Sequence, residues 1–334
     1  MNRRQFLMLA SGLLGAGLAG KALPRTRTHA GMTGLVYDDI FLEHRLAPDH
    51  PESPERLRHV MAALGRSGLL PHLQRLERLP DVLDWIYRIH SPAHVRSIQA
   101  RYGRAHEVAC AVVGGVLAAV KAVCSGELRN AFCATRPPGH HAMNTGREEG
   151  FCFYNAVAVA ARYAQEAFCL EKILIVDWDY HHGNATEAAF YSDPSVLFFS
   201  THDFHAYPGT GDPARTGEGP GRGFNINVHL PCGAGDADIL GSFEEKLLPA
   251  AHSFRPDLIL ISAGFDSRKD DLLGCLEITD QGFVTMTESI MELADRYCGG
   301  RVVSVLEGGY NLSGLASAVV AHVETLMRKD IENA

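Results

Sequence analysis

The chain has 334 residues, of which 46% are hydrophobic and 21% are charged, a composition typical of a globular protein with enough apolar material for a core. This length suits one large α/β domain or two ordinary domains. The formal net charge is -8 and no basic stretch compensates for it, which argues against nucleic acid as a partner, because nonspecific binding to phosphate backbones depends on clustered Lys and Arg.

The first thirty residues differ from the rest of the chain. Arg3 and Arg4 precede an apolar run over residues 6–19 that is rich in Leu, Ala and Gly. A stable membrane-spanning helix needs ~20 apolar residues, so the pattern predicts a signal peptide over residues 1–30 and no membrane span in the mature chain. The paired arginines resemble a bacterial twin-arginine signal, which predicts an exported, periplasmic protein. The alternative is an amphiphilic terminus without a targeting role.

The chain has eight cysteines, and most of them lie in apolar segments such as residues 131–133 and 151–153. An exported protein would usually form disulfides. The apolar surroundings instead predict reduced, buried thiols that pack as small hydrophobic side chains. The alternative is that one pair of these cysteines forms a disulfide.

No linker, repeat or low-complexity tract interrupts the chain after residue 31, which predicts a single domain over residues 31–330. Ser53 and Pro54 are typical of the start of a helix, and apolar residues recur after them at helical spacing up to Leu64. Residues 108–123 are almost wholly Ala, Val, Leu and Gly. Because this stretch contains Lys121 and is too short to cross a membrane, it predicts a buried helix.

Five short apolar runs alternate with helical stretches and are predicted to form buried parallel strands. They span residues 131–134, 173–176, 196–199, 258–261 and 302–306. Each run is followed by a segment that carries histidine, aspartate, serine, tyrosine or glutamate. Because the carboxyl ends of parallel strands share one edge of a sheet, these segments should meet at one ligand-binding edge. The sequence predicts an α/β fold, in which helices flank a mainly parallel central sheet.

Asp179 and His181 lie two residues apart where a predicted strand becomes a loop, so both side chains can face the same side. Asp266, at the end of another strand, could supply a third ligand. Two carboxylates and one imidazole leave an open position on a tetrahedral zinc ion, as in a catalytic site. Zinc polarises a carbonyl oxygen and activates water, which suits amide hydrolysis. The alternative is that Asp179 caps a helix and His181 is an ordinary loop histidine.

Two other segments carry groups suited to catalysis. His140 and His141 are adjacent, and imidazole titrates near neutral pH, so they suit proton transfer. Tyr310 follows two glycines that let the backbone place a phenol in a site, where its hydroxyl could donate to an oxyanion. The alternatives are a hydrogen-bonded turn for the histidines and simple packing for the tyrosine.

Six motifs in this order resemble those of the histone deacetylase family. They are RPPGHHA at 136–142, GFCFYN at 150–155, DWDYHHGN at 177–184, YPGTGD at 207–212, GFD at 264–266 and EGGYN at 307–311. The resemblance begins near His50 and covers nearly all of the chain after the predicted signal. It implies an arginase/deacetylase-like fold and a hydrolase that removes an acyl group from an acylated lysine or amine. Asn184 and Glu307 are most similar to the class II branch and its bacterial amidohydrolase relatives.

The resemblance implies a zinc ion with three ligands, Asp179, His181 and Asp266. It implies that His141 is the general base and that it later protonates the amine leaving group. His140 would assist electrostatically, and Asp177 would orient it. Asn184 stands where many relatives have an aspartate behind the second histidine, so the basicity of His141 should differ from theirs.

The resemblance also implies a narrow substrate channel and a second ion. Phe151 and Tyr207 would form the walls of the channel, and the carbonyl of Gly150 would accept a hydrogen bond from the substrate amide. A potassium ion would lie near the zinc, held by Asp177, Asp179, Ser200 and the main-chain carbonyls of His181 and Thr201.

Two positions bear on the substrate. Leu273 stands where a polyamine-selective relative carries glutamate, so an anionic gate for a cationic polyamine is missing. No aspartate occurs between Asp84 and Asp177, although many relatives carry one there to hold a peptide backbone. Because the aspartate that would hold a peptide backbone is missing, an acetylated polyamine or another small amide remains an alternative to an acylated lysine.

Two further alternatives involve other functions. Arginase-like ureohydrolases share this sheet type but need two metal ions and additional aspartates, whereas the paired histidines and Tyr310 suit one zinc ion. An exported protein that only binds an acyl amine would be favoured by a missing ligand or phenol, and all of these residues are present.

Overall fold

The computed structural model describes residues 32–332, so the predicted signal over residues 1–30 lies outside the described residues. Eight strands form one sheet in which all neighbouring strands run parallel, in the order β2-β1-β3-β8-β7-β4-β5-β6. The strands are β1 (Thr33–Val36), β2 (Gln74–Leu76), β3 (Asn130–Cys133), β4 (Ile173–Asp177), β5 (Val196–His202), β6 (Asn225–His229), β7 (Leu258–Ala263) and β8 (Val302–Leu306). This confirms the predicted α/β fold with a parallel central sheet.

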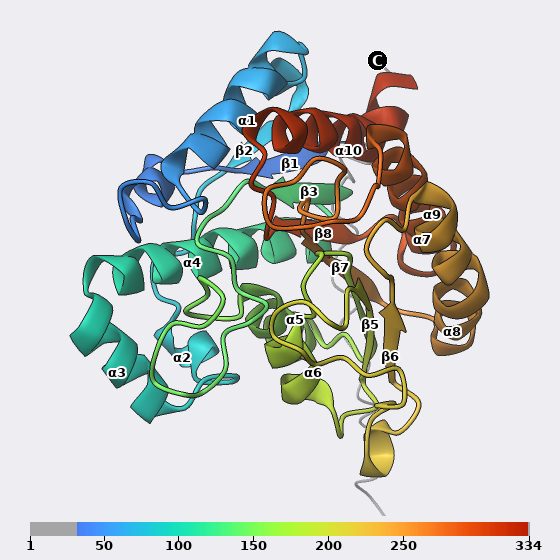
Figure 1. Ribbon diagram of the computed structural model, residues 1–334, viewed down its shortest axis with the longest axis horizontal. Coiled ribbons are helices and arrows are strands. Elements are labelled where there is room, and N and C mark those ends of the chain that lie inside the picture. Colours follow the sequence, from blue (N-terminus) through green and yellow to red (C-terminus); the bar gives the residue numbers. More distant parts are fainter. Residues whose placement is uncertain (1–31, 333–334) are drawn as a thin grey trace, which may run out of the picture.

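Helices cover both faces of the sheet (Figure 1). One side carries α1 (Pro54–Arg66), α7 (Asp236–Ser242), α8 (Leu248–Phe254), α9 (Asp280–Cys298) and α10 (Leu312–Glu332). The other side carries α4 (Arg104–Cys124), α5 (Ala156–Phe168) and α6 (Asn184–Phe190), with α2 (Leu83–Ile86) and α3 (Pro92–Tyr102) outside α4 and α5. Burial on both faces explains why β3, β4, β7 and β8 read as continuous apolar runs.

The two helices predicted from the sequence are present. Helix α1 begins at Pro54, and Ser53 before it has extended backbone angles, as expected of an N-cap position, although its side chain makes no capping hydrogen bond. Helix α4 contains the apolar stretch 108–123. Its length and composition would also suit a membrane span, but 78% of its most apolar window is buried inside the fold, as expected of a core helix. A Cβ atom at Gly115 would lie 2.5 Å from Val36, so glycine allows α4 to pack closely on β1.

Three strands were not predicted, and all three lie toward an end of the sheet. Strand β1 has only four residues, and β2 has three that are exposed or half-buried at one edge. Strand β6, at the other edge, alternates asparagine with Ile226 and Val228, so it lacks the continuous apolar run of a central strand. The central strands were predicted because both of their faces are buried.

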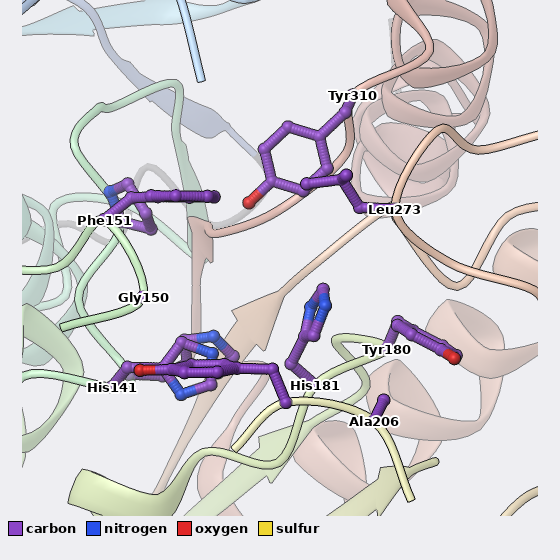
Figure 2. Close-up of a pocket in the computed structure, with 11 residues that line it drawn as sticks. His141, Gly150, Phe151, Tyr180, His181, Ala206, Leu273 and Tyr310 are labelled. Atoms are coloured by element: carbon purple, nitrogen blue, oxygen red, sulfur yellow. The ribbon is translucent and has the colours of Figure 1, made fainter. Parts of the chain in front are cut away.

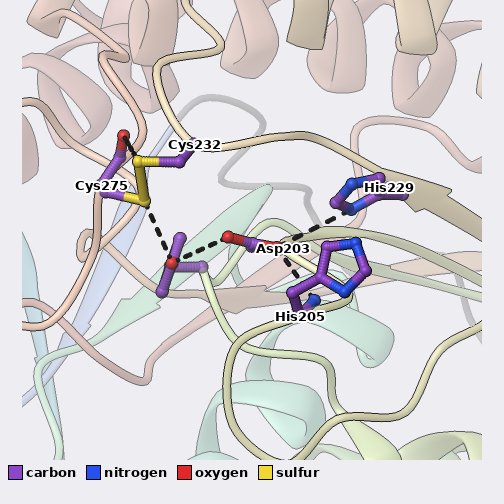
Figure 3. Close-up of a disulfide and its surroundings, with 6 residues drawn as sticks. Asp203, His205, His229, Cys232 and Cys275 are labelled. Carbon is purple, nitrogen blue, oxygen red and sulfur yellow. Dashed lines mark hydrogen bonds and ion pairs between the residues drawn. A yellow bond between two sulfur atoms is a disulfide. The ribbon is translucent and has the colours of Figure 1, made fainter.

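The cysteines differ in part from the prediction. Cys232 and Cys275, which are 43 residues apart, form a disulfide that joins the loop after β6 to the loop after β7. Figure 3 shows this disulfide near Asp203 and His229. The prediction of buried thiols holds for Cys133, Cys152 and Cys298, whereas Cys169 is exposed. Apolar neighbours in the sequence indicated the buried thiols, but Cys232 lies in an exposed loop beside Gly233, where this signal is missing.

Candidate active site

The polar segments predicted to meet do meet at the carboxyl ends of five neighbouring strands, β3, β8, β7, β4 and β5. A cavity of about 450 Å³ opens there. It is lined by Pro138, His140, His141, Gly150, Phe151, Tyr180, His181, Ala206, Tyr207, Leu273 and Tyr310 (Figure 2). Pro138, Tyr180 and Ala206 were not predicted as site residues. Tyr180 lies between two predicted metal ligands, so its position in the sequence could have indicated it.

Asp179, His181 and Asp266 form one group beside this cavity. Each offers a ligand atom within 4.8 Å of the other two, and this is the one such metal-type group among the side chains of residues 32–328. The Nδ1 atom of His181 lies 3.1 Å from Asp179 Oδ1 and 3.1 Å from Asp266 Oδ2. Both carboxylates are buried, whereas the ring of His181 is partly exposed to the cavity.

The backbone around these carboxylates holds them in place and leaves little room. Tyr180 N donates to Asp266 Oδ1 at 2.9 Å, and Gly308 N donates to Asp179 Oδ2 at 2.8 Å. A Cβ atom at Gly264 would come within 2.1 Å of Asp179 Oδ2, and one at Gly308 within 2.0 Å of Asp266 Oδ2. Glycine is therefore required at both positions for the carboxylates to approach each other.

The electrostatics of this group suit a bound cation. Burial and the neighbouring Asp179 carboxylate raise the pKa of Asp266 to about 7. Two buried carboxylates this close are unfavourable without a neutralising charge. A divalent ion would supply that charge, and two carboxylate oxygens with one imidazole nitrogen form a donor set that zinc accepts with a position left open. The residues present therefore fit a zinc ion.

The histidine pair lies next to this group, and each ring has its own partner. His140 Nδ1 lies 3.1 Å from Asp177 Oδ2, and His141 Nδ1 lies 2.8 Å from Asn184 Oδ1. Because the amide oxygen of Asn184 can only accept, the Nδ1 atom of His141 must carry the proton in this hydrogen bond, which leaves Nε2 free to accept a proton when the ring is neutral.

The two rings have pKa values shifted in opposite directions. Burial lowers the pKa of His140, but the carboxylates of Asp179 and Asp177 outweigh burial and raise it to about 10. Burial and the neighbouring charge of His140 hold the pKa of His141 well below its ordinary value. Environments that separate two pKa values in this way are typical of groups with different roles in acid–base chemistry.

Tyr310 reaches the cavity from the loop after β8. Its hydroxyl points into the cavity between Phe151 and Leu273 (Figure 2). Burial raises the pKa of Tyr310 well above its ordinary value, so the phenol stays protonated and can donate. The carboxylate of Asp271 accepts the N–H of Tyr310 at 2.7 Å and that of Asn311 at 3.0 Å, which fixes this loop. Asp271 was not predicted, because it acts on backbone groups 39 residues or more away.

The predicted channel residues all line the cavity. Phe151 and Tyr207 come from two different loops, and Tyr207 and Leu273 are the most exposed of the lining residues, at 49% and 40%. Gly150 has a φ of 54°, and a Cβ atom there would lie 2.3 Å from the ring of His141. This position therefore needs glycine both for its backbone and for its close approach to the histidine.

The residues predicted to hold potassium lie deeper. Asp177 at the end of β4 is the register partner of Ser200 on β5, and both are fully buried. Strand β5 continues to His202, so Ser200 and Thr201 belong to the strand and not to the loop after it. Ser200 Oγ lies 2.8 Å from His202 Nδ1, and Thr201 Oγ1 is buried without a hydrogen-bond partner among the described residues.

Comparisons with known proteins show the family of this chain. A model of the histone deacetylase domain matches residues 50–326. A probable deacetylase of Archaeoglobus fulgidus is 36% identical over 85% of this chain and 82% of its own length. Histone deacetylase 5 of Arabidopsis thaliana is 38% identical over 88% of this chain, which spans only 49% of that longer relative.

A solved structure is similar as well. The crystal structure of the HDA15 HD domain superimposes with a TM-score of 0.84 at 34% identity, and the match covers 90% of this chain and 89% of that one. These matches favour the deacetylase prediction over the arginase-like and non-catalytic alternatives. Because the domain model covers most of the sequence and these relatives agree with it, the chain belongs to the histone deacetylase family and is a deacetylase, a hydrolase of amide bonds.

Proposed function

We propose that this deacetylase is zinc-dependent and removes an acetyl-like acyl group from an acylated lysine side chain or another acylated amine. One observation carries the proposal. The buried group of Asp179, His181 and Asp266 borders a largely apolar cavity that also holds a histidine pair and a phenol. Amide hydrolysis needs a polarised carbonyl, a base and an oxyanion donor, and this arrangement offers a group for each of them.

Asp179, His181 and Asp266 would hold the zinc through two carboxylate oxygens and one imidazole nitrogen. When bound, zinc supplies Lewis-acid chemistry, because it polarises the amide carbonyl and lowers the pKa of water. The chain's own part is to keep the ligands in place. The N–H groups of Tyr180 and Gly308 do so by donating to the two carboxylates.

We assign proton transfer to the histidine pair. His141 is neutral near pH 7 because its pKa is lowered, so its Nε2 atom can take a proton from the water that attacks the carbonyl and give it to the departing amine as the C–N bond breaks. The hydrogen bond to Asn184 keeps the ring in the tautomer that this role requires. His140, oriented by Asp177, would contribute positive charge next to the reacting carbonyl.

Tyr310 and the channel residues would act on the acyl group. The protonated Tyr310 hydroxyl would donate to the oxygen of the carbonyl as negative charge develops on it. Phe151 and Tyr207 would flank the apolar part of the substrate, and the Gly150 carbonyl would accept from its amide N–H. The channel would thereby exclude bulk water from the apolar part of the substrate and leave the carbonyl accessible to the water that hydrolysis consumes.

We also propose a potassium ion near the zinc. Support comes from the buried pair of Asp177 and Ser200 on adjacent strands and from the chemistry of the donors, which are carboxylate, hydroxyl and main-chain carbonyl oxygens, including those of His181 and Thr201. Oxygen donors suit a hard monovalent cation. The proposal requires that activity depend on the potassium concentration in a sodium-free buffer.

A small acylated amine is the second candidate substrate. The chain has no aspartate between Asp84 and Asp177 that could hold a peptide backbone, which favours a small amine over a peptide. Leu273 at the mouth offers no anionic group for a cationic polyamine. These two observations together favour an uncharged small amide over an acetylated polyamine.

The test is a substrate panel with the purified protein, measured before and after chelation and zinc reloading. It compares an acetyl-lysine reporter amide, an acetyl-lysine peptide, an acetylated polyamine and uncharged acetyl amides. The proposal requires at least one acyl amide to be hydrolysed in a zinc-dependent manner. Equal activity of the chelated and the reloaded protein would contradict the role of zinc.

We further propose that the protein is exported to the periplasm. The proposal rests on the arginine pair and apolar run within residues 1–30. The Cys232–Cys275 disulfide is compatible with it, because disulfides persist in oxidising compartments such as the periplasm.

A further inference from the structure

Glu307 is a buried carboxylate, and the zinc and proton-transfer roles proposed above do not use it. It follows β8 directly and is 1% exposed. Its Oε2 atom accepts the backbone N–H of Gly139 at 2.6 Å and that of His140 at 3.3 Å. Its Oε1 atom accepts from Ser262 Oγ on the neighbouring strand β7 at 3.3 Å. One side chain therefore anchors a turn that lies 167 residues or more away in the sequence.

The anchored turn is the one that carries the histidine pair. Ala185 N donates to the carbonyl of His140 at 3.1 Å, so Glu307 holds the N–H side of this residue while α6 holds its carbonyl side. On the far side of the turn, a Cβ atom at Gly139 would lie 2.7 Å from the carbonyl of Tyr154. The turn is thus enclosed by close contacts, and Glu307 supplies the acceptor for its buried N–H groups.

The backbone of Glu307 leads directly into the phenol loop. Gly308 and Gly309 separate it from Tyr310, and Gly308 N also holds a carboxylate of the proposed zinc site. The main chain of Glu307 is itself fixed, because its N–H donates to Ala263 at 3.1 Å and its carbonyl accepts from Arg56. The histidine turn and the phenol loop are therefore connected through this one residue.

We propose that Glu307 is a positioning residue for the deacetylation reaction, because it holds the His140–His141 turn at a fixed place relative to Tyr310. This inference rests on the proposed function, which assigns chemistry to those three residues. A displacement of catalytic groups by about 1 Å can cost a hundredfold in rate, so loss of this anchor should act on kcat. The substrate channel has no contact with the carboxylate, so KM should change little.

Two variants of similar size separate the acceptor from the volume. Glu307→Gln keeps a side-chain oxygen that can accept from Gly139 and His140, whereas Glu307→Leu removes the acceptor. Because Glu307→Leu leaves the buried N–H groups of Gly139 and His140 without an acceptor, it should also lower Tm, so kcat is measured well below the Tm of each variant. We expect Glu307→Leu to lower kcat about a hundredfold and Glu307→Gln to remain within about tenfold of the wild type. If Glu307→Leu does not fold, Glu307→Met replaces it.

Ser304→Ala is the matched control. Ser304 is buried on β8, the strand that Glu307 follows, and its hydroxyl lies 2.9 Å from His322 Nε2, away from the cavity. Ser304→Ala should lower Tm, because it removes this buried hydrogen bond, and should leave kcat at the wild-type level. Wild-type kcat in Glu307→Leu, or equal loss in Glu307→Gln and Glu307→Leu, would overturn the proposal.

Amide hydrogen exchange gives a readout that does not depend on activity. In Glu307→Leu, a peptide covering Gly139 and His140 should exchange faster than in the wild type, while a peptide covering β4 should not. Glu307→Gln should exchange like the wild type at both places. Unchanged exchange at Gly139 and His140 in Glu307→Leu would overturn the proposal. A zinc-loaded wild type that hydrolyses no acyl amide would instead contradict the proposed function. The exchange result would still show whether Glu307 anchors the histidine turn.

Discussion

The Nδ1 atom of His141 lies 2.8 Å from the amide oxygen of Asn184, so an uncharged side chain stands behind this imidazole. Replacing the amide by a carboxylate in Asn184→Asp would place a negative charge beside the ring and stabilise the imidazolium, which raises the pKa of His141. If the neutral ring is the base, activity is lost as pH falls through this pKa. The acid limb of kcat/KM should therefore move to higher pH, by ~1 unit or more.

The measurement is kcat/KM from pH 5 to pH 9 for the wild type and for Asn184→Asp, with Asn184→Ala as the control. The alanine variant removes the acceptor without adding charge, so it should lower the rate without raising the acid limb. An acid limb that is unmoved or shifted to lower pH in Asn184→Asp would argue against His141 as the base.

The proposed zinc ligands make a second prediction. Asp179→Ala and Asp266→Ala each remove one of three ligands, so both variants should lose zinc and activity together. Asp238→Ala, which changes an exposed aspartate in α7, should keep both. Elemental analysis of dialysed protein measures the zinc bound per chain in each variant. Two tightly bound transition metals in the wild type would contradict a single-zinc mechanism.

The central part of the fold could be predicted from the sequence, and the edges could not. Strands β4 and β7 are flanked by helices on both faces, so each appears as an uninterrupted apolar run. Edge strand β2 carries exposed polar residues, and edge strand β6 contains Asn225 and Asn227, which are buried and donate to Glu187. Without an apolar run, no local signal distinguishes either strand from a loop. The sequence therefore predicted the strands that form long apolar runs but not how many strands the sheet has.

The residues of the candidate site likewise include some that the sequence predicted and some that it did not. His141, His181 and Tyr310 were found because they stand in short motifs of chemically capable residues. Asp271 was not found, because its carboxylate binds backbone N–H groups, which no side-chain motif reveals. For the same reason the sequence placed Glu307 in a family branch but gave no sign that it holds the histidine turn.

The disulfide leads to a prediction on stability. Cys232 and Cys275 close a loop of 43 residues, and a crosslink of this span stabilises a protein by roughly 2–4 kcal/mol, because it restricts the unfolded chain. Cys232→Ser together with Cys275→Ser should lower the free energy of unfolding by about that amount. Cys169→Ser, at an exposed free cysteine, is the matched control and should change little. Denaturant unfolding with and without a reductant measures the effect, and an unchanged midpoint in the double variant would contradict it.

The proposed export makes a prediction that needs no enzyme activity. A fusion of residues 1–30 to a reporter that folds before export should carry the reporter out of the bacterial cytoplasm. Arg3→Lys together with Arg4→Lys keeps the charge but removes the paired arginines, so it should block export. Cell fractionation measures the reporter, and unaffected export of the lysine variant would indicate another route.

The last prediction separates the roles of Tyr310 and His141. Tyr310→Phe keeps the ring that packs near Phe151 and below the guanidinium of Arg56, and it removes only the hydroxyl that points into the cavity. If that hydroxyl donates to the oxyanion, its hydrogen bond forms chiefly in the transition state. Loss of such a donor typically costs ~3 kcal/mol, so kcat should fall roughly a hundredfold or more, with little change in KM. His141→Ala should also lower kcat, but through lost proton transfer, so its pH profile should lose the acid limb that Tyr310→Phe retains. Neither residue belongs to the proposed ligand group, so both variants should keep their zinc. The measurement is kcat, KM and zinc content across pH on an acyl amide, and near-normal kcat in zinc-loaded Tyr310→Phe would mean that the tyrosine serves only packing.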